Sequence, residues 1–92
     1  MKALLNDGFE IDVLEDNIGD WEFLEVLNDI DEGETGLIVR AARMLLGNEG
    51  VKVLKEHLRN EQGKVPTTKM VDALRELMES VNTLKNSEPS PA

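Results

Sequence analysis

Closely spaced carboxylates are the side chains of this chain best suited to chemistry, because such pairs can bind calcium or share acid and base roles. The stretch from Asp29 places Asp31 at the third position of a calcium loop. In that stretch, however, Glu34 stands where the turn needs glycine, and Arg40 stands where a closing glutamate would bind the ion. A second stretch, 58–69, has the turn glycine but begins with leucine and ends with lysine. Neither loop carries the ligands of a calcium site.

Other catalytic or cofactor sites are also not indicated. An acyl carrier needs a serine at the start of a helix for its phosphopantetheine arm, whereas the serines here are Ser80, Ser87 and Ser90, all late in the chain. His57 is the single histidine, and no cysteine is present to bind a metal beside it or to form a disulfide. Glycine-rich phosphate loops are absent from the sequence. We therefore expect a protein that is not an enzyme, without catalytic, cofactor-binding or metal-binding residues.

Composition points to one acidic globular domain. The chain has 92 residues, 32% of them charged and 40% hydrophobic, with a net charge of −9. Residues 1–34 contain twelve acidic residues against the single base Lys2, a balance that disfavours contact with nucleic acid, since phosphate binding requires cations. The N-terminus lacks the apolar core of a signal peptide, and the longest apolar run is too short to span a bilayer. These features predict a cytoplasmic protein that binds neither nucleic acid nor membrane.

The apolar stretch 37–46 is the element around which we expect the others to pack. It predicts a short helix that ends at Gly47. Further helices are expected at 20–31, 49–60 and 67–84, a polar bend at 15–19, and a small β-hairpin over 3–13 that turns at 6–8. The predicted fold is mainly α, a compact bundle of about four short helices with an N-terminal hairpin. It forms a single domain over 1–85, followed by a disordered tail at 86–92.

The expected core centres on the 37–46 helix and the faces turned toward it. It comprises Leu24, Leu27, Ile38, Ala42, Leu45 and Leu54. In the hairpin, apolar residues alternate with acids, as in a half-buried strand. Because an open strand edge invites pairing, we expect self-association through Phe9, Ile11 and Val13.

Two features could bind a partner. The helix at 67–84 has a broad apolar stripe, and it predicts a groove for a partner helix formed by Met70, Leu74, Leu77, Met78 and Val81. Trp21 is either a core anchor or an exposed contact for a partner. The acids that follow it form a stripe, which is either solvated, paired with the chain's own bases, or directed at a basic partner.

The order of short motifs along residues 4–84 resembles that of the small tail assembly chaperones of long-tailed bacteriophages. The motifs are structural rather than catalytic. They are the strand L-x-x-G-F-E-I (5–11), an acidic D-W helix (20–33), the L-L-G helix end (45–47), K-E-H-L-R (55–59), the turn N-E-Q-G-K-V (60–65) and a final amphipathic helix.

The resemblance implies a mostly helical oligomer of the host cytoplasm that is absent from the mature virion. Such chaperones are thought to coat and solubilise the tape-measure protein and to recruit tail-tube subunits. Two other classes stay open. One is an acidic regulator that mimics DNA or blocks a basic host protein, and the other is a structural subunit of the virion.

Overall fold

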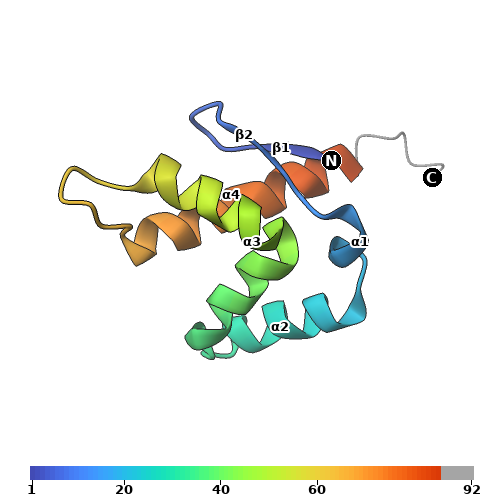
Figure 1. Cartoon of the computed structure of the whole chain (residues 1–92). Helices are drawn as coiled ribbons and strands as arrows, with labels where there is room; N and C mark the ends of the chain where they lie inside the picture. Colours follow the sequence, from blue (N-terminus) through green and yellow to red (C-terminus); the bar gives the residue numbers. More distant parts are fainter. Residues whose placement is uncertain (86–92) are drawn as a thin grey trace.

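A two-stranded hairpin and four α-helices make up residues 1–85, the part of the chain that the computed structural model describes (Figure 1). The elements are β1 (Lys2–Leu4), β2 (Glu10–Asp12), α1 (Glu15–Ile18), α2 (Trp21–Asp31), the 3-10 helix η1 (Thr35–Leu37), α3 (Ile38–Leu58) and α4 (Thr67–Lys85). The predicted mainly helical fold with an N-terminal hairpin is confirmed. The tail expected at 86–92 lies outside the described residues.

Helix α3 contains both of the helices expected at 37–46 and 49–60, and it bends at Gly47. This residue has φ 73° and ψ 168°, a backbone conformation that only glycine adopts at low cost. The bend leaves carbonyl groups of the first half without helical partners. The backbone N–H of Leu14 donates to the Leu45 carbonyl at 2.7 Å, and the side-chain amide of Asn17 donates to the Met44 carbonyl at 2.8 Å. The segment at 15–19, expected as a polar bend, is thus a helical turn. It stabilises the bend of α3 at Gly47, which is here called the elbow.

The hairpin is tied to α4 along the outer edge of β1. Ala3 pairs with Ile11 in an antiparallel register, so the N–H groups of Leu4 and Asn6 point away from β2. The first donates to Ser80 Oγ at 3.1 Å, and the second donates to Glu76 Oε1 at 2.8 Å. Figure 1 shows the hairpin lying across α3 and α4. The hairpin is therefore part of the core rather than a free appendage.

The core lies where α2, α3, α4 and the hairpin meet. Of the residues expected in it, Ala42, Leu45 and Leu54 are buried, and Leu27 and Ile38 are half-buried. The prediction for Leu24 is wrong, because that side chain is 54% exposed. The inward face of α2 carries Phe23, Val26, Leu27 and Ile30, and Leu24 lies about 100° around the helix from Phe23. No helix in residues 1–85 is both long and apolar enough to cross a membrane.

Candidate functional site

The predicted α4 groove residues divide between the core and the surface. Leu77 and Val81 are completely buried, and they pack with Ala73 against the other elements of the core. Met70, Leu74 and Met78 are only half-buried. The surface that α4 offers to a partner therefore does not include Leu77 or Val81. It includes Val71, a half-buried residue that was not among the predicted groove residues.

Two neighbouring hollows follow this side of α4. One, of about 320 Å³, lies between α2, α3 and α4, and the other, of about 470 Å³, lies between α3 and the first half of α4. Ile38 and Leu74 line both hollows, and the two neighbouring hollows are here together called the α4 groove. Its apolar walls consist of Leu27, Ile30, Ile38, Val39, Ala41, Ala42, Val51, Val65, Met70, Val71, Leu74 and Met78. A surface of this kind offers apolar contact to a partner of matching shape.

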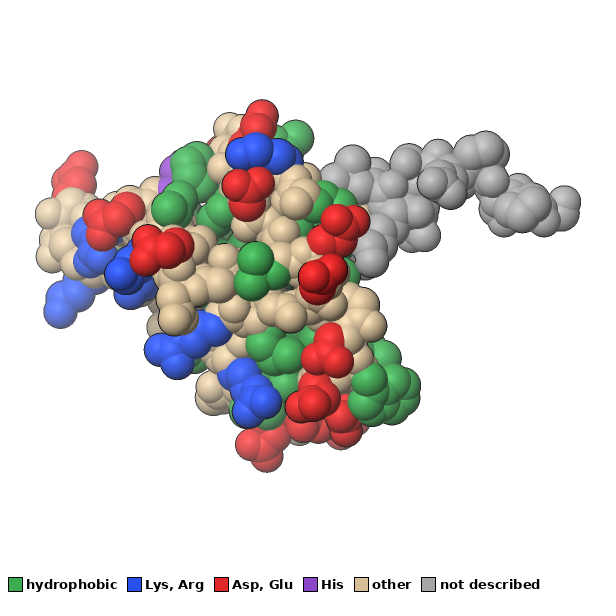
Figure 2. All heavy atoms as spheres, turned by 45° about the vertical axis from the view of Figure 1, so that its right-hand side comes forward, with side chains coloured by type: hydrophobic (Ala, Val, Ile, Leu, Met, Phe, Trp, Pro, Cys, Tyr) green, Lys and Arg blue, Asp and Glu red, His purple; other side chains and the backbone are tan. Residues whose placement is uncertain are grey.

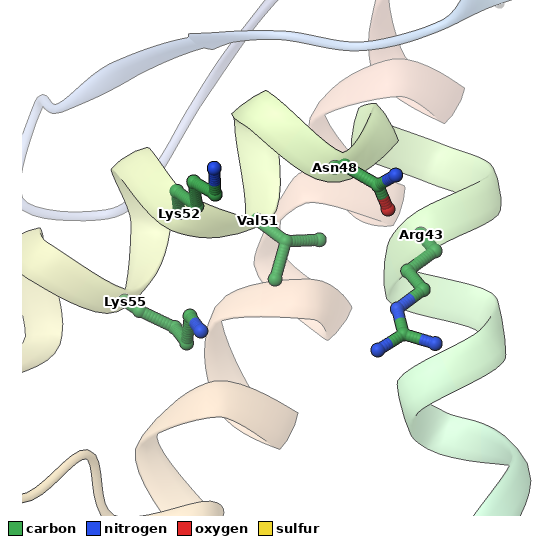
Figure 3. A pocket seen from close by; sticks show the side chains of 5 residues that line it. All are labelled: Arg43, Asn48, Val51, Lys52 and Lys55. Carbon is green, nitrogen blue, oxygen red and sulfur yellow. The ribbon is translucent and has the colours of Figure 1, made fainter.

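The elbow of α3 makes one end of the α4 groove basic. A hollow of about 400 Å³ inside the bend is lined by Arg43, Asn48, Val51, Lys52 and Lys55, and three of these residues also line the groove. Figure 3 shows the side chains of Arg43 and Lys55 reaching from the two halves of α3 into the same space, with Val51 between them. Neither cation forms an ion pair within residues 1–85. The end of the groove can therefore hold a carboxylate.

Trp21 is not brought together with the α4 groove. Its side chain is 70% exposed, and it shares a separate hollow of about 430 Å³ with Leu24, Glu25, Asn28 and Asp29. The interpretation of Trp21 as a core anchor is thus wrong, because the side chain is exposed, and its role as a contact for a partner stays a prediction. Figure 2 shows acidic side chains along the right-hand and lower edges of the molecule, next to exposed apolar groups, while Lys and Arg gather mostly on the left.

The hairpin residues expected to self-associate face inward. Ile11 and Val13 are buried in the core. The ring of Phe9 stacks on that of His57, with their centroids 3.8 Å apart, and His57 Nε2 lies 2.8 Å from Asp7 Oδ2. The Phe9 backbone N–H, which donates to Asp7, and then His57 lower the pKa of Asp7 below its usual value. Within the hairpin, the backbone edge of β2 is left for self-association, since Ile11 and Val13 pack in the core and Phe9 stacks on His57.

Sequence reasoning missed three surface residues, namely Leu24, Arg43 and Lys55. Leu24 sits in an apolar pair with Phe23, and either residue could have faced inward. Arg43 and Lys55 are twelve residues apart, and only the bend at Gly47 directs them into one hollow. The glycine was the one available signal for this, because it marks the point where the helix direction changes.

Within residues 1–85, no group of three or more His, Asp or Glu side chains is close enough to hold a metal ion. Surfaces that could bind a partner include the apolar α4 groove with its basic end, the acidic face around Trp21, and a hollow of about 520 Å³ lined by Phe9, Lys52, Val53, Glu56 and His57. Comparisons with models of protein families, with curated proteins and with solved structures found no match for this chain.

Proposed function

We propose that this protein is a tail assembly chaperone of a long-tailed bacteriophage, which holds a helical segment of the tape-measure protein in the α4 groove. The observation that carries the proposal is the groove itself. It leaves Leu74 and Met78 half-exposed beside apolar side chains of α2 and α3. The tape-measure protein is proposed as the partner because the motif order along residues 4–84 resembles that of the chaperones.

An amphipathic helix is the occupant that such a surface fits. Apolar grooves between helices accept the apolar stripe of a partner helix, whose side chains recur every three or four residues. Met70 and Met78 have flexible, polarisable side chains that can adapt to different apolar residues along a long partner. Arg43 and Lys55 favour a helix that places a carboxylate at the elbow. A long tape-measure helix could present many such segments.

Net charge supports the role of a solubilising factor. A charge of −9 on 92 residues opposes non-specific aggregation and helps to keep a bound apolar segment in solution. In this proposal the protein works in the host cytoplasm, coats the tape-measure protein as several copies, helps to recruit tail-tube subunits, and leaves before the virion is complete.

Co-expression with the tape-measure protein of the same phage or prophage tests the proposal. Met78→Lys places a charge at the mouth of the groove, and its long side chain can still reach water, so the variant is expected to fold. It should leave most of the tape-measure protein insoluble. Gln62→Lys adds the same charge to an exposed loop and should solubilise as the wild type does.

Two results would count against the proposal. One is a Met78→Lys variant that melts like the wild type and still keeps the tape-measure protein soluble. The other is binding that is lost at high salt but is as strong in Met78→Lys as in the wild type. Screening weakens exposed charge pairs far more than apolar contact, so this result would favour the acidic regulator.

A further inference from the structure

We propose that the exposed face of α2 around Trp21 is a second binding surface, and that its partner is a cationic protein segment with an apolar side chain. This face, here called the α2 face, consists of Trp21, Leu24, Glu25, Asn28 and Asp29. It shares no residue with the α4 groove. The inference therefore stands whether or not the groove binds a tape-measure helix.

The apolar part of the α2 face is unusually exposed. Trp21 has the largest exposed fraction among the large hydrophobic residues of 1–81, whose side chains the structure describes, and Leu24 lies three residues further along the same side of the helix. The hollow beside them is bordered by polar side chains. An exposed tryptophan next to a hollow and within a polar rim is typical of the anchors that dominate protein interfaces.

The charge of the α2 face specifies the occupant. Glu25 and Asp29 line the hollow, and α2 and the residues next to its ends carry the further acids Asp20, Glu22 and Glu32. No acidic residue of α2 forms an ion pair with the side chains described at residues 1–81. Lysine or arginine of a partner could pair with these carboxylates and also lie on the indole ring of Trp21. Nucleic acid and anionic membranes have the wrong sign of charge.

The α2 face is also held rigidly. Phe23 and Val26 anchor the opposite side of α2 in the core, and η1 and α3 pack against the helix. A surface fixed in this way loses little conformational entropy when it binds. Because the contact residues are exposed, they can be replaced without opening the core. Binding can therefore be separated from folding.

Fluorescence of Trp21 offers a direct test, because it is the only tryptophan in the chain. The probe is a synthetic amphipathic helical peptide with lysine on one face and leucine on the other. Its binding should shift the emission of Trp21 to the blue, as the indole leaves water. The same peptide with glutamate in place of lysine should produce no shift, and a lysine peptide with glutamine in place of leucine should bind more weakly.

A matched pair of variants separates local from overall charge. Glu25→Lys combined with Asp29→Lys should weaken binding by about tenfold or more, the loss typical of a hot spot. Glu61→Lys combined with Glu79→Lys makes the same change in net charge at exposed sites away from α2. The affinity of this variant for the peptide should stay within about twofold of that of the wild type. The hollow beside Trp21 shares no residue with the α4 groove, so the Trp21 emission reports binding at the α2 face and distinguishes a failure here from a failure of the groove.

Three results would overturn the proposal. The first is equal loss of binding in the two charge variants, since net charge alone would then account for attraction. The second is an unchanged Trp21 emission at saturating peptide. The third is light scattering that shows copies of this chain associating through Trp21, with Trp21→Ala restoring the monomer, because the occupant would then be a second copy and not a cationic partner.

Discussion

The backbone N–H of Leu14 donates a hydrogen bond of 2.7 Å to the carbonyl oxygen of Leu45, two residues before the bend at Gly47. In an unbroken helix this carbonyl would accept from the N–H four residues further on. The segment after the hairpin therefore takes the place of a missing helical turn and fixes the elbow of α3. The elbow in turn directs Arg43 and Lys55 into one hollow at the end of the α4 groove.

Gly47→Ala should destabilise the protein by about 1–3 kcal/mol. Its φ of 73° with ψ near 168° is costly for any residue with a Cβ, and that Cβ would also lie 3.4 Å from Leu14 Cδ1. Gly36→Ala is the control, since its Cβ would meet no atom within 4 Å and its φ is not positive. Urea denaturation of both variants measures the difference. Equal stability of the two would show that Gly47 does not hold the elbow.

Leu45→Ala should lower the free energy of unfolding by about 2–5 kcal/mol, because a fully buried leucine leaves a cavity when it is truncated. Leu24→Ala removes the same atoms from an exposed position and should change stability by less than about 0.5 kcal/mol. Thermal melting distinguishes the two variants. A small effect at Leu45 would contradict its place at the centre of the core.

Asp7 should make stability depend on pH in the acid range. Its pKa is lowered in the folded state from a usual value of 3.8, chiefly by the Phe9 backbone N–H and then by His57. The stabilisation from this group is thus fully present above pH 3.8 and is lost as the pH falls through the lower, folded pKa. Asp7→Asn should remove that part of the acid dependence of urea unfolding. Identical acid profiles for wild type and variant would exclude this role.

Self-association, if it uses the hairpin, should depend on the outer edge of β2. The edge of β1 is occupied by Ser80 and Glu76, and the Asp12 carbonyl lies close to α3 at Gly50. The N–H of Glu10 points outward, because Glu10 and Leu4 form a pair that is not hydrogen-bonded. Glu10→Pro removes this donor and should reduce the oligomer seen by light scattering at high concentration. An unchanged oligomer would place the contact elsewhere.

Local patterns were enough to predict most of the elements of this fold. The alternation of Phe9, Ile11 and Val13 with acids indicated the hairpin, and Gly47 indicated where the first half of α3 ends. Such patterns could not predict which residues are buried by contacts with distant parts of the chain. Leu24 and Phe23 are neighbours, and only the packing of α2 decides which of them is buried.

The residues of the candidate site could also be predicted only in part from local patterns. The stripe on α4 is wide enough to serve both the core and a groove, and the docked hairpin decides that Leu77 and Val81 belong to the core. Leu74 and Met78 are left to the groove for the same reason. Hydrogen bonds from Leu4 to Ser80 and from Asn6 to Glu76 fix that docking. These contacts join residues at least 70 positions apart, and no local pattern marks them.

Methyl NMR of the four methionines tests the central claim most directly, with a tape-measure helix as the titrant. Met70 and Met78 line the α4 groove, whereas Met1 and Met44 lie outside it and serve as internal controls. The account predicts that the ε-methyl signals of Met70 and Met78 shift in proportion to bound helix while those of Met1 and Met44 stay in place. A saturable complex in which the groove methyls do not move, or in which Met1 and Met44 alone move, would contradict it.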